Sequence, residues 1–61
     1  MGLSESVDGI ISEMLALRQI LRRTAPLHRF SEADLKRIEE AAESCEALLK
    51  RIREEAGVHQ P

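Results

Sequence analysis

The chain has 61 residues, a formal net charge of −2 and 43% hydrophobic residues, with Phe30 as its single aromatic side chain. The scarcity of aromatic residues favours helices over a sheet, and a domain this small usually needs a disulfide, a metal ion or oligomerisation for stability. One cysteine excludes an internal disulfide, no cluster of metal ligands is apparent, and no apolar run approaches the roughly 18 residues of a membrane-spanning helix. We therefore expect an all-α cytoplasmic chain with no metal, no cofactor and no membrane contact, stabilised by a second copy or by another protein.

A first helix is expected over about residues 5–24. Its start is assigned to Ser4 or Ser6, because either hydroxyl could cap the free N–H groups of a first turn. Pro26 disfavours helical geometry at the residue before it and ends the helix near Thr24. The apolar residues recur at alternating spacings of three and four, which is typical of a heptad seam: Leu3, Val7, Ile10, Met14, Leu17 and Leu21.

A turn over residues 25–31 leads to a second helix expected over about residues 32–56. Ser31 and Asp34 are spaced as the N-cap and N3 residues of a capping box. Gly57 follows at the position where a left-handed residue closes a helix. The second helix carries its own heptad seam: Leu35, Ile38, Ala42, Cys45, Leu49 and Ile52.

The two seams together predict an antiparallel helical hairpin. Five more apolar residues lie beside the seams and are expected to form a second apolar surface: Ile11, Leu15, Ile20, Ala41 and Leu48. Apolar stripes wider than a single seam belong to helices with two or more neighbours. We therefore expect the hairpin to form a homodimeric four-helix bundle, with the seams carrying assembly.

The window from residue 14 to residue 31 contains no acidic residue and holds four basic ones: Arg18, Arg22, Arg23 and Arg29. One interpretation is a phosphate-binding ridge for RNA or DNA. The other is a solvated face, or a strip that pairs with acidic groups of another subunit or of an acidic protein partner. The net charge of −2 and the lack of aromatic residues among the arginines favour the second interpretation. If two hairpins pack with their turns at opposite ends, this strip would face Glu5, Asp8 and Glu13 of the second copy.

The sequence offers little for catalysis. Cys45 occupies a seam position, where a free thiol behaves as a small hydrophobic residue. The glutamates of the second helix are expected to be solvated, because a two-helix chain offers no obvious pocket to shift their pKa values. No nucleophile is paired with a base, and no glycine-rich phosphate loop is present. We therefore expect the protein not to be an enzyme.

In size and layout the chain resembles the Rop family of small plasmid RNA-binding proteins, through its short connection and the heptad seam in each helix. The resemblance implies a dimeric four-helix bundle and an RNA-binding alternative that would use the arginine strip. The leading hypothesis from the residues is a non-enzymatic hairpin that dimerises and acts as a small regulator or adaptor by binding another protein. A further alternative is a stabilising subunit or chaperone of a larger partner.

Overall fold

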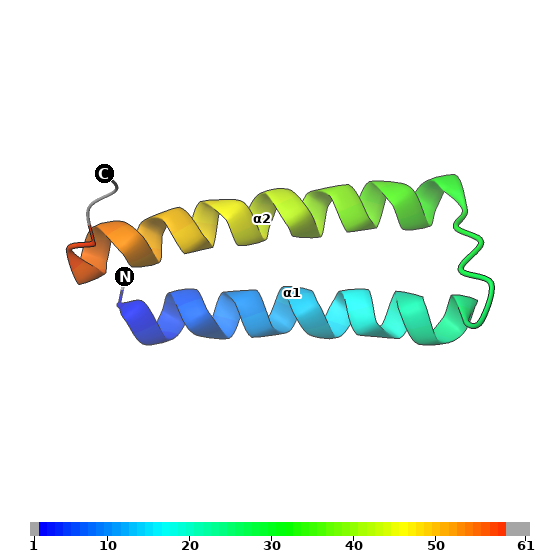
Figure 1. Ribbon diagram of the computed structural model, residues 1–61, viewed down its shortest axis with the longest axis horizontal. Coiled ribbons are helices and arrows are strands. Elements are labelled where there is room, and N and C mark those ends of the chain that lie inside the picture. Colours follow the sequence, from blue (N-terminus) through cyan, green and yellow to red (C-terminus); the bar gives the residue numbers. More distant parts are fainter. Residues whose placement is uncertain (1, 59–61) are drawn as a thin grey trace.

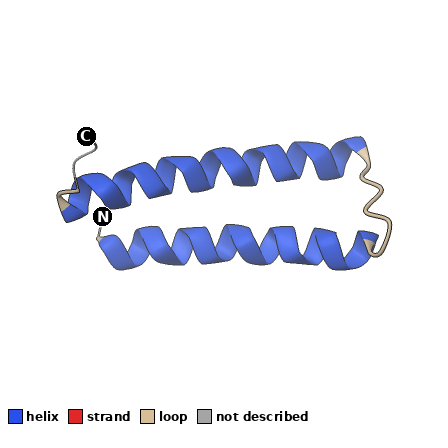
Figure 2. Ribbon diagram, in the orientation of Figure 1, coloured by secondary structure: helices blue, strands red, loops and turns tan. Residues whose placement is uncertain are grey.

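The computed structural model describes residues 2–58, which form two helices, α1 (Leu3–Thr24) and α2 (Glu32–Ala56). The helices lie side by side and antiparallel, and one loop joins them at one end (Figure 1). The part of the chain that the structure describes contains helices and loop but no strand (Figure 2). The radius of gyration is 14.0 Å, whereas a compact chain of this length would have about 10–11 Å. The hairpin is therefore elongated, and each helix packs against one other helix within the chain.

Both predicted ends of α2 are confirmed. The Ser31 hydroxyl accepts the Asp34 N–H at 3.1 Å, and the Asp34 carboxylate accepts the Ser31 N–H at 3.1 Å, which completes the capping box. At the other end Gly57 adopts φ 78°, a left-handed conformation that glycine enters without steric cost. The Val58 N–H then donates to the Arg53 carbonyl at 2.9 Å, as in a Schellman motif.

The predicted start of α1 is wrong. The helix begins at Leu3 with Gly2 as its N-cap, and no side chain caps the first turn. Neither serine plays the expected role, because Ser4 is exposed within the helix and Ser6 is fully buried. The Ser6 Oγ has no hydrogen-bond partner among the described residues. Ser6 therefore lies within α1 and takes part in the packing between the helices. The helix begins before the position that either serine indicates.

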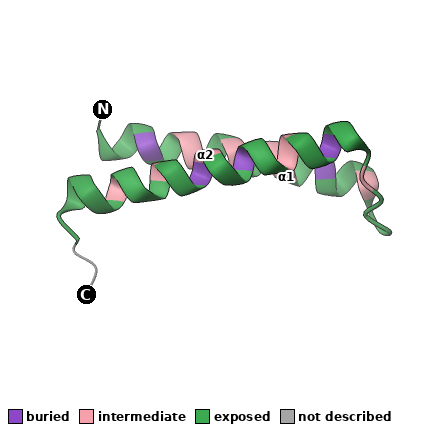
Figure 3. Ribbon diagram, turned by 90° about the horizontal axis from the view of Figure 1, so that it is seen from above, coloured by how far each residue is buried: buried purple, intermediate pink, exposed green. Residues whose placement is uncertain are grey.

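The two helices meet along a stripe that advances by alternating steps of four and three residues. Its fully or nearly fully buried members are Ser6, Ile20, Asp34, Ala41 and Cys45. Half-buried residues fill the rest of the stripe: Ile10, Glu13, Leu17, Thr24, Ile38, Leu48 and Ile52. Figure 3 shows buried and half-buried segments recurring along both helices, with exposed segments between them. The contact is therefore continuous over the length of the hairpin.

This contact is rotated from the one that the seams predict. Ile20, Ala41 and Leu48 were expected on a second apolar surface, but they lie in the contact between α1 and α2. Two small residues of α1, Ser6 and Gly9, lie at this contact. A Cβ atom on Gly9 would lie 2.9 Å from Cδ1 of Leu48, so the glycine makes room for the leucine.

Seam residues that the rotation leaves outside the contact are exposed on the hairpin. These are Leu3, Val7, Met14, Leu21, Leu35, Ala42 and Leu49. The remaining seam residues keep a place in the contact, either half-buried or, for Cys45, buried: Ile10, Leu17, Ile38, Cys45 and Ile52.

Candidate interaction surface

One face of the hairpin is closed by polar contacts between the helices. The Arg37 guanidinium donates to the Glu13 carboxylate at 2.6 Å. Near the loop, Arg23 of α1 donates to Asp34 of α2, whose side chain is 10% exposed. The approach of Gly9 to Leu48 lies on this same face, which we name the closed face.

The ion pairs of the closed face favour the charged forms of their carboxylates. Arg23 holds the pKa of Asp34 below its usual value, and the Ser31 N–H contributes in the same direction. Arg37 likewise lowers the pKa of Glu13, with help from Ser44, and Glu13 raises the pKa of Arg37 in return. Both carboxylates therefore accept hydrogen bonds within their own chain and are not free to pair with a second molecule.

The opposite face of the hairpin is apolar. Its exposed side chains come from both helices, and most remain between 43% and 53% exposed: Leu3, Val7, Met14, Leu21, Leu35, Ala42 and Leu49. Successive residues of a helix are rotated by about 100°, which places these side chains on the other side of the contact from Gly9, Glu13 and Arg37. Because the helices run antiparallel, the same rotation on α1 and α2 leads to the same face. We name this set the apolar face.

The apolar face is continuous with the contact between the helices. On α1, Ile10 and Leu17 alternate with Val7, Met14 and Leu21 in the same seam and are half-buried. The seam of α2 alternates in the same way between exposed and covered residues. A molecule that covered the apolar face would therefore extend the packing of the hairpin rather than start a separate core.

Two residues of the predicted second surface do stay exposed. Ile11 is 52% exposed and Leu15 is 51% exposed, and both lie on α1 beyond the apolar face. The other three members of that predicted surface belong to the contact between the helices, as described above. The predicted second surface is therefore reduced to an extension of the apolar face along the outer side of α1.

The arginine strip is not a single unit. Arg23 is engaged with Asp34, whereas Arg18, Arg22 and Arg29 are exposed and form no ion pair with a described residue. Arg18 and Arg22 lie on α1 one turn apart, and Arg29 lies in the loop. Of the two free arginines of α1, Arg18 borders the apolar face, whereas Arg22 lies beyond it at the heptad position of Leu15.

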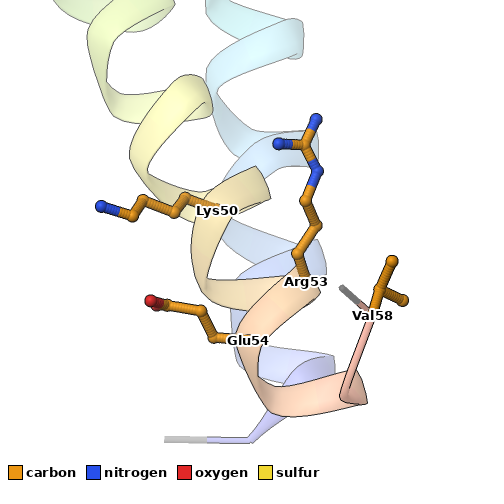
Figure 4. A pocket seen from close by; sticks show the side chains of 4 residues that line it. All are labelled: Lys50, Arg53, Glu54 and Val58. Carbon is orange, nitrogen blue, oxygen red and sulfur yellow. The ribbon is translucent and has the colours of Figure 1, made fainter. Parts of the chain in front are cut away.

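The described residues provide no arrangement typical of a catalytic or metal site. A hollow of about 340 Å³ lies at the end of α2 and is lined by Lys50, Arg53, Glu54 and Val58. In Figure 4, Lys50 and Glu54 extend to one side of the helix and Arg53 and Val58 lie on the other. The hollow therefore lacks a nucleophile paired with a base.

The described residues hold neither a cluster of metal ligands nor a membrane span. Within residues 2–58, no three histidine, cysteine, aspartate or glutamate side chains gather as a metal site would require, and His59 lies outside the described residues. Cys45 is a free thiol, 7% exposed, in the contact between the helices, as its seam position predicts. Neither α1 nor α2 is apolar over a stretch long enough to cross a membrane.

Comparison with models of known families, with curated proteins and with solved structures finds no match to this chain. The likeness to Rop therefore rests on length and helical layout alone.

Proposed function

We propose that the protein is a non-catalytic interaction module that assembles through the apolar face, with two copies forming a four-helix bundle. The observation that carries this proposal is the row of half-exposed aliphatic side chains that continues the seam of each helix. Leu35 and Leu49 are each about half exposed, although they occupy seam positions. Side chains of this kind in one contiguous patch mark an interaction site on a soluble protein.

The size of the exposed surface supports the same proposal. The single chain exposes 4881 Å², whereas a compact folded monomer of 6.9 kDa would expose about 4,000 Å². Two-helix hairpins bury too little surface to be very stable alone, and small domains commonly gain stability by oligomerising. Packing a second hairpin on the apolar face gives each helix two neighbours, which is the arrangement that wide apolar stripes require.

In this role the protein acts as a regulator or adaptor whose bundle presents its outer surface to a target. The exposed pair Ile11 and Leu15 provides apolar contacts at the edge of that surface. The absence of a catalytic cluster among the described residues is consistent with a binding role.

A matched pair of substitutions tests the proposal. Ala42 and Ala47 are both exposed alanines of α2, but only Ala42 belongs to the apolar face. Ala42→Glu would place a carboxylate in the middle of the assembly surface, where burying an unpaired charge is costly, and Ala47→Glu would add the same charge on the outer side of the helix. We expect a dimeric mass by light scattering for the unsubstituted chain and for Ala47→Glu, and a monomeric mass for Ala42→Glu at the same concentration.

Circular dichroism on the same samples completes the test. Loss of helicity together with loss of mass in Ala42→Glu would show that the hairpin depends on its partner. A monomeric mass for the unsubstituted chain at every concentration would overturn self-association, and equal masses for the two variants would remove the apolar face from the interface.

A further inference from the structure

Two hairpins can cover each other's apolar faces in two symmetric ways. In the same-end arrangement the two loops lie at one end of the bundle, and α1 of each copy packs against α2 of the other. In the opposite-end arrangement the loops lie at different ends, and like helices pack together. Both arrangements bury the same apolar side chains, so the charges that flank the face decide between them.

The flanking charges differ in sign between the two helices. Beyond the apolar face, on the side of each helix that is turned away from the contact between α1 and α2, the next residues have the same heptad position in both helices. On α1 this position is held by Ser4, Ile11 and Arg18, and on α2 by Glu32, Glu39, Glu46 and Arg53. All seven are exposed. The α1 edge of the face therefore carries no acidic group, and the α2 edge is acidic except at Arg53.

The register of the hairpin sets the heights of these charges. Arg23 contacts Asp34, and Gly9 lies against Leu48, and both pairs give the same register. The long Arg37 side chain reaches Glu13 from one heptad nearer the loop than the α2 residue level with Glu13. Arg18 lies five residues before Arg23, and Glu39 lies five residues after Asp34. Arg18 and Glu39 are therefore at the same height along the hairpin. A rotation about an axis parallel to the helices keeps heights unchanged, so it brings Arg18 of one copy beside Glu39 of the other.

The opposite-end arrangement is electrostatically worse. It packs α2 against α2, and the register that places Glu39 of one copy near Glu46 of the other also places Glu32 near Arg53. Each contact occurs twice in a symmetric dimer, so the attraction of Glu32 to Arg53 is offset by the repulsion between Glu39 and Glu46, whereas the same-end arrangement has no such repulsion at this position. Like charges at flanking positions disfavour a helix pairing. The acidic groups once expected to compensate are not all available, since Glu13 is engaged by Arg37 on the closed face. Glu5 and Asp8 remain exposed, but Glu5 lies two residues before Val7, about 200° round the helix, and so points away from the apolar face.

We propose that the second copy docks in the same-end arrangement, with Arg18 of each chain paired to Glu39 of the other. This inference rests on the proposed self-association and specifies its geometry. It also gives Arg18 a role in assembly, whereas Arg23 pairs with Asp34 of its own chain.

Charge reversal at Glu39 separates the two arrangements by the sign of its effect. Glu39→Arg faces Arg18 in the same-end bundle and weakens the dimer, whereas in the opposite-end bundle it would face Glu46 and tighten the dimer. We expect the dissociation constant, measured by sedimentation equilibrium, to rise roughly fivefold to thirtyfold, as two flanking ion pairs become repulsive. Adding Arg18→Glu should restore most of the affinity. Lys36→Glu is the control, because it changes the charge of the chain as much as Arg18→Glu does but lies on the outer side of α2.

A distance measurement gives an independent test. Leu27 is 70% exposed in the loop, so a spin label on Leu27→Cys in a Cys45→Ala background reports the separation of the two loops. The same-end bundle predicts about 20 Å, two helix diameters. The opposite-end bundle predicts a separation near the 41 Å length of the hairpin. A spin label on Ser12→Cys, near the middle of α1, serves as the control for assembly. The two labels of a dimer should show dipolar coupling in either bundle.

The outcomes distinguish the two proposals. A dimeric mass with close loop labels and a weakened Glu39→Arg supports the same-end arrangement. A dimeric mass with distant loop labels, or a tighter Glu39→Arg dimer, overturns that arrangement and leaves self-association standing. A monomeric mass without coupling at either label overturns both.

Discussion

Arg23 donates to Asp34 across the contact between the helices, and the same carboxylate accepts the Ser31 N–H that opens α2. One side chain thus joins the last turn of α1 to the first turn of α2. This carboxylate therefore holds the loop at both of its ends.

Acid should weaken the hairpin. The pKa values of Asp34 and Glu13 are lowered in the folded chain by their arginine partners, so their contribution is fully present above the ordinary carboxyl pKa and is lost as pH falls through the lower folded values. We expect the thermal midpoint to fall as the pH is reduced from about 5 towards 3. Thermal melts followed by circular dichroism would measure it, and the Asp34→Asn/Glu13→Gln double variant should show a shallower dependence over that range. An equally steep dependence in the double variant would assign the effect to other carboxylates.

Ser6→Ala should stabilise the protein. The serine is fully buried and its hydroxyl has no described partner, and a buried unpaired polar group is costly. Alanine also has the higher helix propensity. We expect the free energy of unfolding to rise by about 1 kcal/mol in urea titrations at fixed protein concentration. A decrease would indicate that the hydroxyl has a partner in solution.

Gly9 should tolerate one added carbon but not three. In Gly9→Ala the new Cβ meets the flexible tip of Leu48, which can move, and the helix gains up to about 1 kcal/mol in propensity. In Gly9→Val the branched side chain would force the backbones apart at a cost of about 1–3 kcal/mol. Paired urea titrations should therefore show the alanine variant at least as stable as the parent and the valine variant weaker. Equal stability of the two variants would mean that close approach at this point is not required.

Gly57→Ala should destabilise the end of α2. Its φ of 78° is a left-handed conformation, which costs an alanine about 1–2 kcal/mol. Asparagine enters this conformation more readily, so Gly57→Asn should lose less. Thermal melts of both variants test the order, and it would be contradicted by an alanine variant as stable as the parent.

The sequence predicted where α2 begins and ends better than it predicted which side of each helix faces the other. Ser31, Asp34 and Gly57 act through neighbouring backbone groups, so their spacing alone indicates where the helix begins and ends. The start of α1 was misplaced because Gly2 caps it without a side chain and leaves no sequence signal.

The rotation of the contact could not be predicted, because each helix has apolar residues at more heptad positions than one partner covers. A contact through Ile20 and Ala41 and a contact through Met14 and Ala42 are both compatible with the apolar pattern. Small residues such as Ser6 and Gly9, together with the pairing of Glu13 with Arg37, decide the outcome, and these act only once the helices meet.

The position of Cys45 provides a way to follow the hairpin without altering it. Its thiol is 7% exposed between the helices, so a thiol reagent can reach it freely only when α1 and α2 separate. Its rate of modification therefore reports how often the hairpin opens. If assembly holds the helices together, that rate should fall as the protein concentration rises, and the single cysteine would then measure intrachain opening and association in one experiment.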